Sequence, residues 1–312
     1  MDQKKPSIHF VLPGGGPKGC FQAGFLYQLF TKYRNFFELH QIDGTSVGAL
    51  NGYVVACRQL DMLQKVWLDI NSISDIFTPF SNLPVVGMLY TAYCAFHQKG
   101  CMTNKKMMEI AKTIDVTVPT DLNRFQCVVT DLLHGNALYV KSCDDENCEH
   151  PRKHKAQLNV KITDMSKYVV ASASPWILVA PVVIEDYSYT DGALLAQYPI
   201  KNIKTTTADL VVVVGHYEDA FSAEGTDGSH ILHFMARLVE ICWQHSNNVK
   251  DMKELIDTNK VILVSHALPI DFLDFKNDTI KNGFNIGKKE ADIFAERYLI
   301  KENKYRPRSS SL

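Results

Sequence analysis

The feature that most constrains this chain is a G-x-S-x-G run, Gly44-Thr45-Ser46-Val47-Gly48. An alternation of apolar and polar residues precedes it at 37–42, and small and apolar residues follow at 47–56. This pattern predicts a strand that turns sharply into a helix, with a strained corner residue whose side chain points out of the turn. The flanking glycines must be small because strand and helix nearly touch there. Ser46 is therefore a candidate nucleophile, and a chance match to a short pattern is the alternative.

A glycine-rich segment lies one strand–helix unit upstream. Residues 7–12 predict a buried first strand, which leads into Pro13-Gly14-Gly15-Gly16-Pro17-Lys18-Gly19. A helix follows, with apolar residues at Phe21, Phe25, Leu26 and Leu29. Consecutive glycines at the start of a helix leave bare backbone N–H groups, which favour an anion.

Two anions are candidates for this segment. Gly14, Gly16 and Gly19 fit G-x-G-x-x-G, a weak dinucleotide fingerprint, but no acidic residue stands where a ribose would need one. The other anion is the oxyanion of a tetrahedral acyl intermediate, which needs preorganised donors near a serine. We favour the oxyanion because Ser46 follows in the next unit, and we expect the amides of Gly14, Gly15 and Gly16 to form the hole.

A third motif lies far downstream. Residues 186–193 predict a strand that ends in Asp191-Gly192, a pair that by itself signals only a turn. Ahead of it, residues 170–176 read as a helix that ends in small residues before Pro175.

In order along the chain, these motifs resemble the patatin-like phospholipase family. The matching segments are the glycine-rich run 14–19, the elbow 44–48 and Asp191-Gly192-Ala193, together with Ala171-Ser172-Ala173-Ser174-Pro175 before the aspartate. The resemblance spans about residues 7–199. It implies a three-layer α/β/α fold with a mostly parallel central sheet and helices on both faces.

The resemblance also implies a lipid acyl hydrolase of the phospholipase A, lysophospholipase or non-specific esterase type, without a cofactor. By this match Ser46 is the nucleophile, Asp191 its base, and the glycine amides the oxyanion hole. Three alternatives stay open. One is a Ser-His-Asp triad with His216, which follows the predicted strand 209–215. The others are an acyltransferase and a non-catalytic lipid-binding relative.

Composition excludes some classes of protein. With 312 residues, 46% hydrophobic, the chain is expected to form one domain over 1–312, with a flexible basic tail at 303–312. A net charge of −1 gives no field that attracts nucleic acid. Residues 1–6 lack the features of a signal peptide, and eight scattered cysteines read as reduced. We expect a cytoplasmic protein whose partners are an acyl ester substrate, phospholipid or other, and a membrane surface that it contacts peripherally.

The uncharged stretch 76–98 contains prolines, a glycine and polar residues, so it does not read as a membrane-spanning helix. We expect a loop at 79–87 and a helix at 88–97. Its aromatic and apolar residues are candidates for an acyl-chain wall or lid, namely Phe77, Phe80, Leu89, Tyr93 and Phe96. An ordinary core helix with a loop is the alternative.

A possible zinc site lies in an acidic insertion. Cys143, Cys148, His150 and His154 are the right residue types for tetrahedral zinc, but a single residue separates the second cysteine from the first histidine. That spacing is tight for closure around one ion. We therefore favour a solvated polar hairpin tip, and keep zinc as the alternative.

The remaining segments are assigned from hydrophobic periodicity. Asp131 is expected to cap the turn of a hairpin, and 194–203 to be irregular. The further predicted elements are helices at 103–114, 230–245, 248–256 and 286–300, strands at 124–130 and 136–141, which pair as that hairpin, and strands at 209–215 and 261–265.

Overall fold

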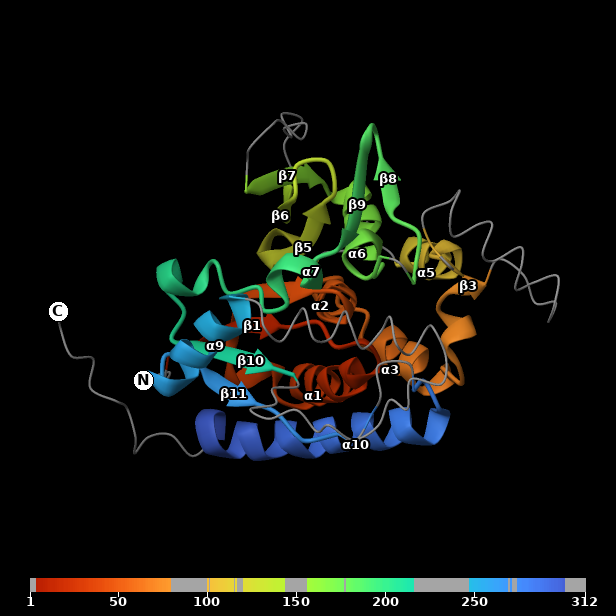
Figure 1. The fold of residues 1–312 in the computed structure, drawn as a ribbon. Coiled ribbons are helices and arrows are strands. Elements are labelled where there is room, and N and C mark those ends of the chain that lie inside the picture. Colours follow the sequence, from red (N-terminus) through yellow and green to blue (C-terminus); the bar gives the residue numbers. More distant parts are fainter. Residues whose placement is uncertain are drawn as a thin grey trace.

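A mostly parallel sheet runs through the molecule, with the first strand near its centre (Figure 1). The structure is a computed structural model that describes residues 4–79, 100, 102–114, 116, 120–143, 156–176, 178–215, 247–268, 270 and 274–300. Within these residues the strand order is β11-β10-β1-β2-β5-β6-β7, with β9 paired to β5 and β8 to β9. The strands are β1 (Ser7–Leu12), β2 (Glu38–Thr45), β5 (Phe125–Asp131), β6 (Asn136–Cys143), β7 (Gln157–Lys161), β8 (Val182–Ile184), β9 (Tyr187–Asp191), β10 (Leu210–Val214) and β11 (Ile262–Val264).

The direction of the strands places the motif residues at one edge of the sheet. Strands β11, β10, β1, β2 and β5 are parallel, so their carboxyl ends lie on the same side. β1 is followed in the chain by its neighbour on one side, β2, whereas its other neighbour, β10, comes much later. Sites in open α/β sheets form at such a change of direction, outside the carboxyl ends of the strands.

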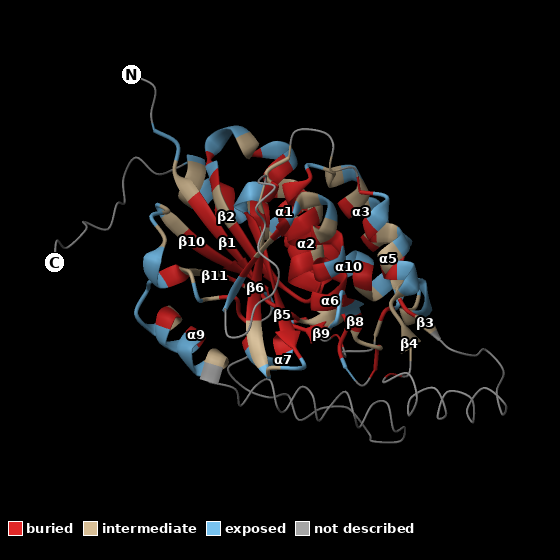
Figure 2. Cartoon of the chain, turned by 90° about the horizontal axis from the view of Figure 1, so that it is seen from above, coloured by how far each residue is buried: buried red, intermediate tan, exposed pale blue. Residues whose placement is uncertain are grey.

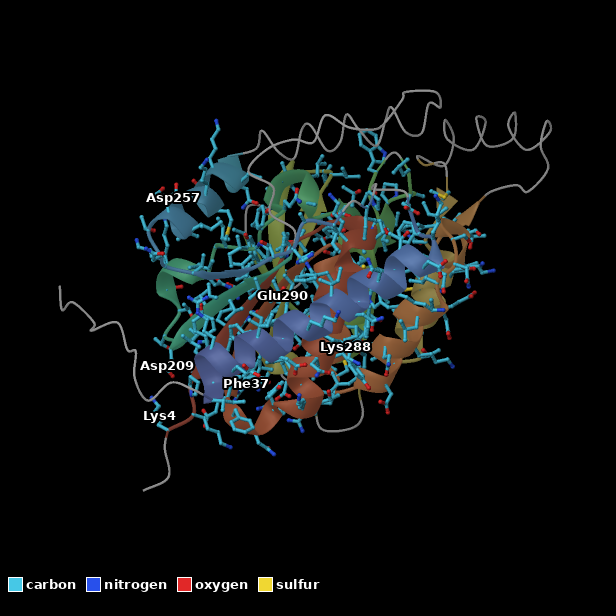
Figure 3. The ribbon with its side chains drawn as sticks, turned by 90° about the horizontal axis from the view of Figure 1, so that it is seen from below. Lys4, Phe37, Asp209, Asp257, Lys288 and Glu290 are labelled. Carbon is cyan, nitrogen blue, oxygen red and sulfur yellow. The ribbon has the colours of Figure 1, made fainter. Side chains whose placement is uncertain are left out.

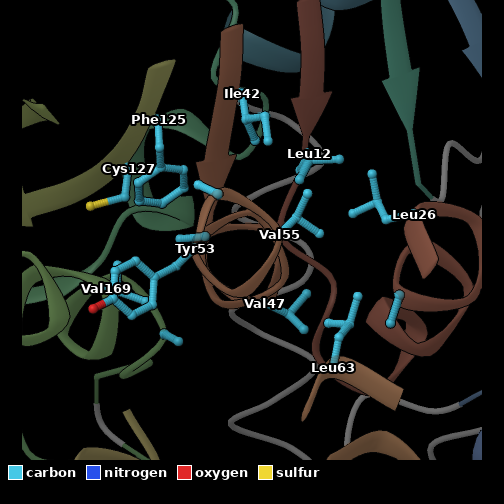
Figure 4. Packing of buried hydrophobic residues seen from close by; sticks show 14 of the residues in the cluster. Leu12, Leu26, Ile42, Val47, Tyr53, Val55, Leu63, Phe125, Cys127 and Val169 are labelled. Atoms are coloured by element: carbon cyan, nitrogen blue, oxygen red, sulfur yellow. The ribbon is translucent and has the colours of Figure 1, made fainter. Parts of the chain in front are cut away.

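One face of the sheet is covered by two layers of helix. α1 (Gly19–Lys32), α2 (Val47–Ala56) and α6 (Met165–Ser172) pack on the sheet, and Figure 4 shows α2 end-on among Leu12, Ile42 and Phe125 of the strands. Outside them lie α3 (Leu60–Asp69), α5 (Lys105–Lys112) and α10 (Asn277–Phe294). Figure 3 shows α10 along the outer surface, with Lys288 and Glu290 labelled on it.

The opposite face is covered more lightly within the described residues. α7 (Ala193–Ala196), the segment 197–206 and α9 (Asn247–Asp257) lie there, and a second apolar cluster joins Val11 and Val213 of the strands to Tyr198 and Met252. Both faces of the central strands are therefore buried (Figure 2). This explains the nearly continuous apolar sequences of β1 and β10, and it confirms the three-layer α/β/α fold.

The described elements match most of the predicted ones. A short two-stranded sheet of β3 (Thr78–Pro79) and β4 (Met102–Thr103) was not foreseen, and the first three residues of the stretch expected to be irregular belong to α7. The predicted loop 79–87, helix 88–97, helix 230–245 and tail 303–312 lie outside the described residues, apart from Pro79 at the end of β3. No described helix is long and apolar enough to cross a membrane.

The start of the last helix was predicted wrongly. α10 begins at Asn277, nine residues before the expected start, and continues as a π-helical segment, Ala295–Ile300. Glycine disfavours helix interiors, yet α10 contains both Gly283 and Gly287. Both instead lie against α1, where a Cβ on Gly287 would come 2.1 Å from the carbonyl oxygen of Phe21. The close approach of α1 and α10 outweighs the local propensity.

Gly24 on α1 makes the reciprocal contact and yields a prediction. Replacing glycine by alanine inside a helix usually raises the free energy of unfolding by roughly 0.5–1 kcal/mol. A Cβ at position 24 would lie 1.9 Å from the carbonyl oxygen of Phe284, so we expect Gly24→Ala to lower the free energy of unfolding by about 1–3 kcal/mol. Urea denaturation measures this. Gly283→Ala is the matched control with a milder effect, because its Cβ meets the movable Cys20 sulfur. A Gly24→Ala variant as stable as the wild type would contradict the packing.

Candidate active site

The turn between β2 and α2 has the predicted elbow geometry. Ser46 has φ 55° and ψ −127°, a conformation that residues other than glycine rarely adopt. Gly48 lets the helix start against the end of β1, since a Cβ there would come 2.1 Å from the carbonyl oxygen of Leu12. The strain is therefore held by packing on both sides, as is common where a side chain must be presented. Ser46 stands at the N-terminus of α2 and is 7% exposed.

The structure brings Ser46 and Asp191 together. Ser46 Oγ donates a hydrogen bond of 2.7 Å to Asp191 Oδ2. Asp191 is the last residue of β9, which runs antiparallel to β5 and carries the carboxylate back toward the end of β2. The other carboxylate oxygen, Oδ1, accepts a bond of 2.8 Å from the amide of Ala193. Two donors and the surrounding chain thus define the orientation of the carboxyl group.

The environment of Asp191 changes its acidity. The residue is 2% exposed. Burial raises the pKa of its carboxyl from the ordinary value of 3.8 to about 7, while the bonds from Ser46 and Ala193 act in the opposite direction. A carboxylate with a pKa near neutrality is a much better proton acceptor than a solvated one, yet it is still ionised in a large share of molecules at pH 7. Chemically, this pair can transfer a proton from a hydroxyl to a carboxylate.

Ser172 supports the elbow from α6. Its hydroxyl accepts a bond of 2.9 Å from the amide of Ser46 and donates one of 2.6 Å to the carbonyl of Val128. Thr130 Oγ1 donates to the carbonyl of Asp191 at 2.9 Å. The backbones of both Ser46 and Asp191 are thereby tied to the same region of β5.

The glycine-rich segment lies beside Ser46. A Cβ added to Gly14 would come 3.1 Å from that of Ser46, so only glycine fits easily. The amide of Gly14 donates to the carbonyl of Gln197 at 3.2 Å. This corrects the expectation that Gly14 contributes to an oxyanion hole, because its N–H is already engaged. The amides of Gly15 and Gly16 have no partner among the described residues, and these two stay candidate donors.

An apolar cavity includes Ser46 and Gly16 in its wall. It lies between α2, α3 and α5 on the helical side of the sheet. Leu50, Val54, Leu63, Trp67, Met107 and Ile110 are among the side chains that line it. Phe77, predicted as part of an acyl-chain wall, also lines it, whereas Phe80, Leu89, Tyr93 and Phe96 lie outside the described residues. The cavity is suited to a hydrocarbon chain.

Two further candidate residues are His216 and Asp131. His216, the alternative triad histidine, lies outside the described residues. Asp131 caps the β5–β6 turn as expected, since its Oδ1 accepts bonds from the amides of Leu133 and His134.

The zinc alternative loses its first ligand. Cys143 is disulfide-bonded, and a disulfide sulfur is not the thiolate that zinc requires. The other three proposed ligands, Cys148, His150 and His154, lie outside the described residues. The described cysteines Cys20, Cys57 and Cys127 are free, as expected, but Cys143 departs from the expectation of reduced thiols.

Sequence reasoning missed the residues that support the site. Ser172 was noted only as part of a resemblance, without a role. Gln22 and Asn51 are both buried polar residues near the glycine-rich segment. The sequence signal that could have identified Gln22 and Asn51 is an amide side chain on an otherwise apolar face of its helix.

Comparison with known proteins relates the chain to a sequence family and to solved structures. The sequence model of a family described as "Patatin-like phospholipase" matches residues 10–203. The structure of VipD from Legionella pneumophila matches with a TM-score of 0.40 and 12% identity, covering 93% of this chain and 67% of that chain. A likeness at this level supports no further conclusion.

The raised pKa of Asp191 predicts a pH-dependent stability. Between about pH 4 and 7 the folded protein keeps a proton on Asp191 that the unfolded chain has lost, so the wild type becomes less stable as pH rises through this window. The Asp191→Asn variant has no carboxyl group to titrate at this position, so its stability does not fall in this way as pH rises. From pH 5 to 8 we expect the variant to gain about 2–3 kcal/mol relative to the wild type in urea denaturation, at about 1.4 kcal/mol per pH unit. Ser46→Ala keeps the carboxyl and loses a bond that lowers its pKa, so this control should lose stability with rising pH at least as steeply as the wild type. Parallel curves for all three proteins would rule out the shift.

Proposed function

Because the chain belongs to the patatin-like phospholipase family, we propose that it hydrolyses acyl ester bonds of lipids with Ser46 as nucleophile and Asp191 as its base. The observation that carries this proposal is the 2.7 Å contact between Ser46 Oγ and Asp191 Oδ2 in the wall of an apolar cavity. A serine hydroxyl is a weak nucleophile until a neighbour takes its proton. Asp191 is in direct contact and is made more basic by burial.

In the first step, Ser46 Oγ attacks the ester carbonyl carbon as its proton passes to Asp191 Oδ2. The carbonyl oxygen takes up the negative charge, and the amides of Gly15 and Gly16 donate hydrogen bonds to it. The intermediate then collapses, the bond to the alcohol breaks, and Asp191 returns the proton to the leaving oxygen. The acyl group remains on Ser46 as an ester.

In the second step, water takes the place of the alcohol. Asp191, again ionised, accepts a proton from this water as its oxygen attacks the acyl-enzyme carbonyl. The Ser46 ester bond breaks, the fatty acid leaves, and the proton passes from Asp191 to Ser46 Oγ. Because the base has to be ionised, the rate should increase as pH rises through about 7.

The apolar lining of the cavity supports the proposal that the protein binds the acyl chain of its substrate there. Its apolar side chains suit the hydrocarbon of a phospholipid, a lysophospholipid or a simpler ester. We propose that the protein reaches such an acyl chain by contacting a lipid surface peripherally.

The assignment of the two residues is tested by substitution. We expect Ser46→Ala and Asp191→Asn each to lower ester hydrolysis by at least about 10³-fold, because each removes a partner of the reacting hydroxyl. Hydrolysis of phospholipid vesicles is measured together with labelling by a fluorophosphonate, which should mark Ser46 in the wild type but label neither Ser46→Ala nor Asp191→Asn. His216→Ala is the control and should keep its rate. Loss of turnover in His216→Ala with retention in Asp191→Asn would replace the dyad by a triad.

The role of the cavity is tested with esters of increasing chain length. Each buried CH₂ contributes about 0.8 kcal/mol, so kcat/KM should rise about three- to fourfold per carbon for short p-nitrophenyl esters until the cavity is filled. Val54→Asp, which places a charge in the wall, should flatten this series. A rate independent of chain length in the wild type would argue against an acyl-binding cavity.

A further inference from the structure

The peptide group between Pro13 and Gly14 is held at both of its polar atoms, and it precedes the two glycine amides that have no partner in the described part of the chain. The amide of Gly14 donates to the carbonyl of Gln197 at 3.2 Å. On the other side of the same peptide, the carbonyl of Pro13 accepts a bond of 2.8 Å from Gln22 Nε2. Peptide groups are planar, so fixing this one limits where the next two amides, those of Gly15 and Gly16, are directed.

Gln22 is itself the end of a chain of buried side-chain hydrogen bonds. Asn51 Nδ2 donates to Gln22 Oε1 at 3.2 Å and to the carbonyl of Gly19 at 3.0 Å. Trp67 Nε1 donates to Asn51 Oδ1 at 2.8 Å. We call Trp67, Asn51 and Gln22 the amide relay. Its members come from α3, α2 and α1, so it links the helix that carries Ser46 to the glycine-rich segment.

The two ends of the amide relay fix its direction. An indole N–H only donates, and a carbonyl oxygen only accepts. Asn51 therefore has to turn its oxygen to Trp67 and its NH₂ to Gln22, and Gln22 has to turn its NH₂ to Pro13. All three members are buried, with exposed fractions of 6%, 1% and 2% for Trp67, Asn51 and Gln22. A broken link would leave a buried polar group unpaired, so the arrangement is held firmly.

We propose that the amide relay is a positioning device that holds the Gly15 and Gly16 amides at the oxyanion of the proposed reaction. The inference rests on the proposed function. Within the described residues none of its members is hydrogen-bonded to Ser46 or Asp191, so they act through the backbone of Pro13. Trp67 and Asn51 also line the apolar cavity, which places the start of the amide relay in the wall that receives the acyl chain.

Gln22→Leu is the sharpest test, since Gln22 does not line the cavity and its loss frees the Pro13 carbonyl. We expect kcat for a medium-chain ester to fall about 10- to 100-fold with KM nearly unchanged, because small misplacements of catalytic donors cost rates of this order. Gln28→Leu on the same helix is the matched control. It removes bonds to Asp292 on α10 and leaves the amide relay intact, so its kcat should stay at the wild-type value.

Inhibitor binding separates positioning from a general structural role. An alkyl trifluoromethyl ketone forms an adduct with an oxyanion, whereas the ether analogue of the substrate does not. In Gln22→Leu the inhibition constant of the ketone should rise in step with the fall in kcat, and that of the ether should not change. Trp67→Phe removes the indole N–H and keeps an aromatic ring in the wall. It should also lower kcat, by about 10-fold.

The outcomes distinguish this inference from the proposed function. The amide relay has no positioning role if Gln22→Leu has the same kcat as Gln28→Leu, or if it loses affinity for the ketone and the ether equally. In either case the proposed hydrolysis by Ser46 is unaffected. If Gln22→Leu shows no folded circular dichroism spectrum, Trp67→Phe decides, and a wild-type kcat there overturns the inference. If the wild type neither hydrolyses esters nor binds the ketone, the proposed function fails, and the amide relay with it.

Discussion

The site depends on one hydrogen bond between residues that are far apart in the chain, Ser46 Oγ to Asp191 Oδ2. Forming it requires a carboxyl group to leave water almost completely, which is unfavourable for its charged form and raises its pKa. The same burial makes the carboxylate a stronger base. The sheet compensates for this unfavourable burial, because β9 pairs with β5 and this pairing places Asp191 beside the elbow. The architecture thus uses backbone pairing energy to hold a pair of groups that would not associate in water.

The elbow adds a second unfavourable feature that packing has to hold. Ser46 has a positive φ, and its amide is satisfied by Ser172 rather than by the helix it precedes. Ser172 and Thr130 connect the backbones of Ser46 and Asp191 to β5, so the two proposed reacting groups share one rigid support. Strain and burial at this point are offset by the large apolar core on the helical side of the sheet. Sites of this kind are commonly placed where the fold can hold such strain.

The glycine-rich segment illustrates why a motif does not specify its own geometry. Gly14, Gly15 and Gly16 are chemically identical, yet the amide of Gly14 bonds to Gln197, whereas those of its two neighbours have no partner among the described residues. Which amide is engaged depends on Gln197 and Gln22, neither of which belongs to the motif. The same holds for α10, whose glycines lie inside the helix where α1 approaches closely. In both cases a neighbour distant in sequence decided the outcome.

The sequence by itself determined the strands at 7–12, 124–130 and 209–215 and the elbow around Ser46, because each depends on local periodicity or on glycines that a tight turn requires. The fold class and the choice of Asp191 came from the resemblance of the ordered motifs to a family, since Asp191-Gly192 alone signals only a turn. The sequence also showed that the segments around the site are rich in apolar residues. Only the tertiary structure decided which glycine amides lack a partner among the described residues, where the last helix begins, and how Ser172 and the amide relay support the site. These depend on contacts between segments separated by many residues, and such contacts leave no periodic trace in the sequence.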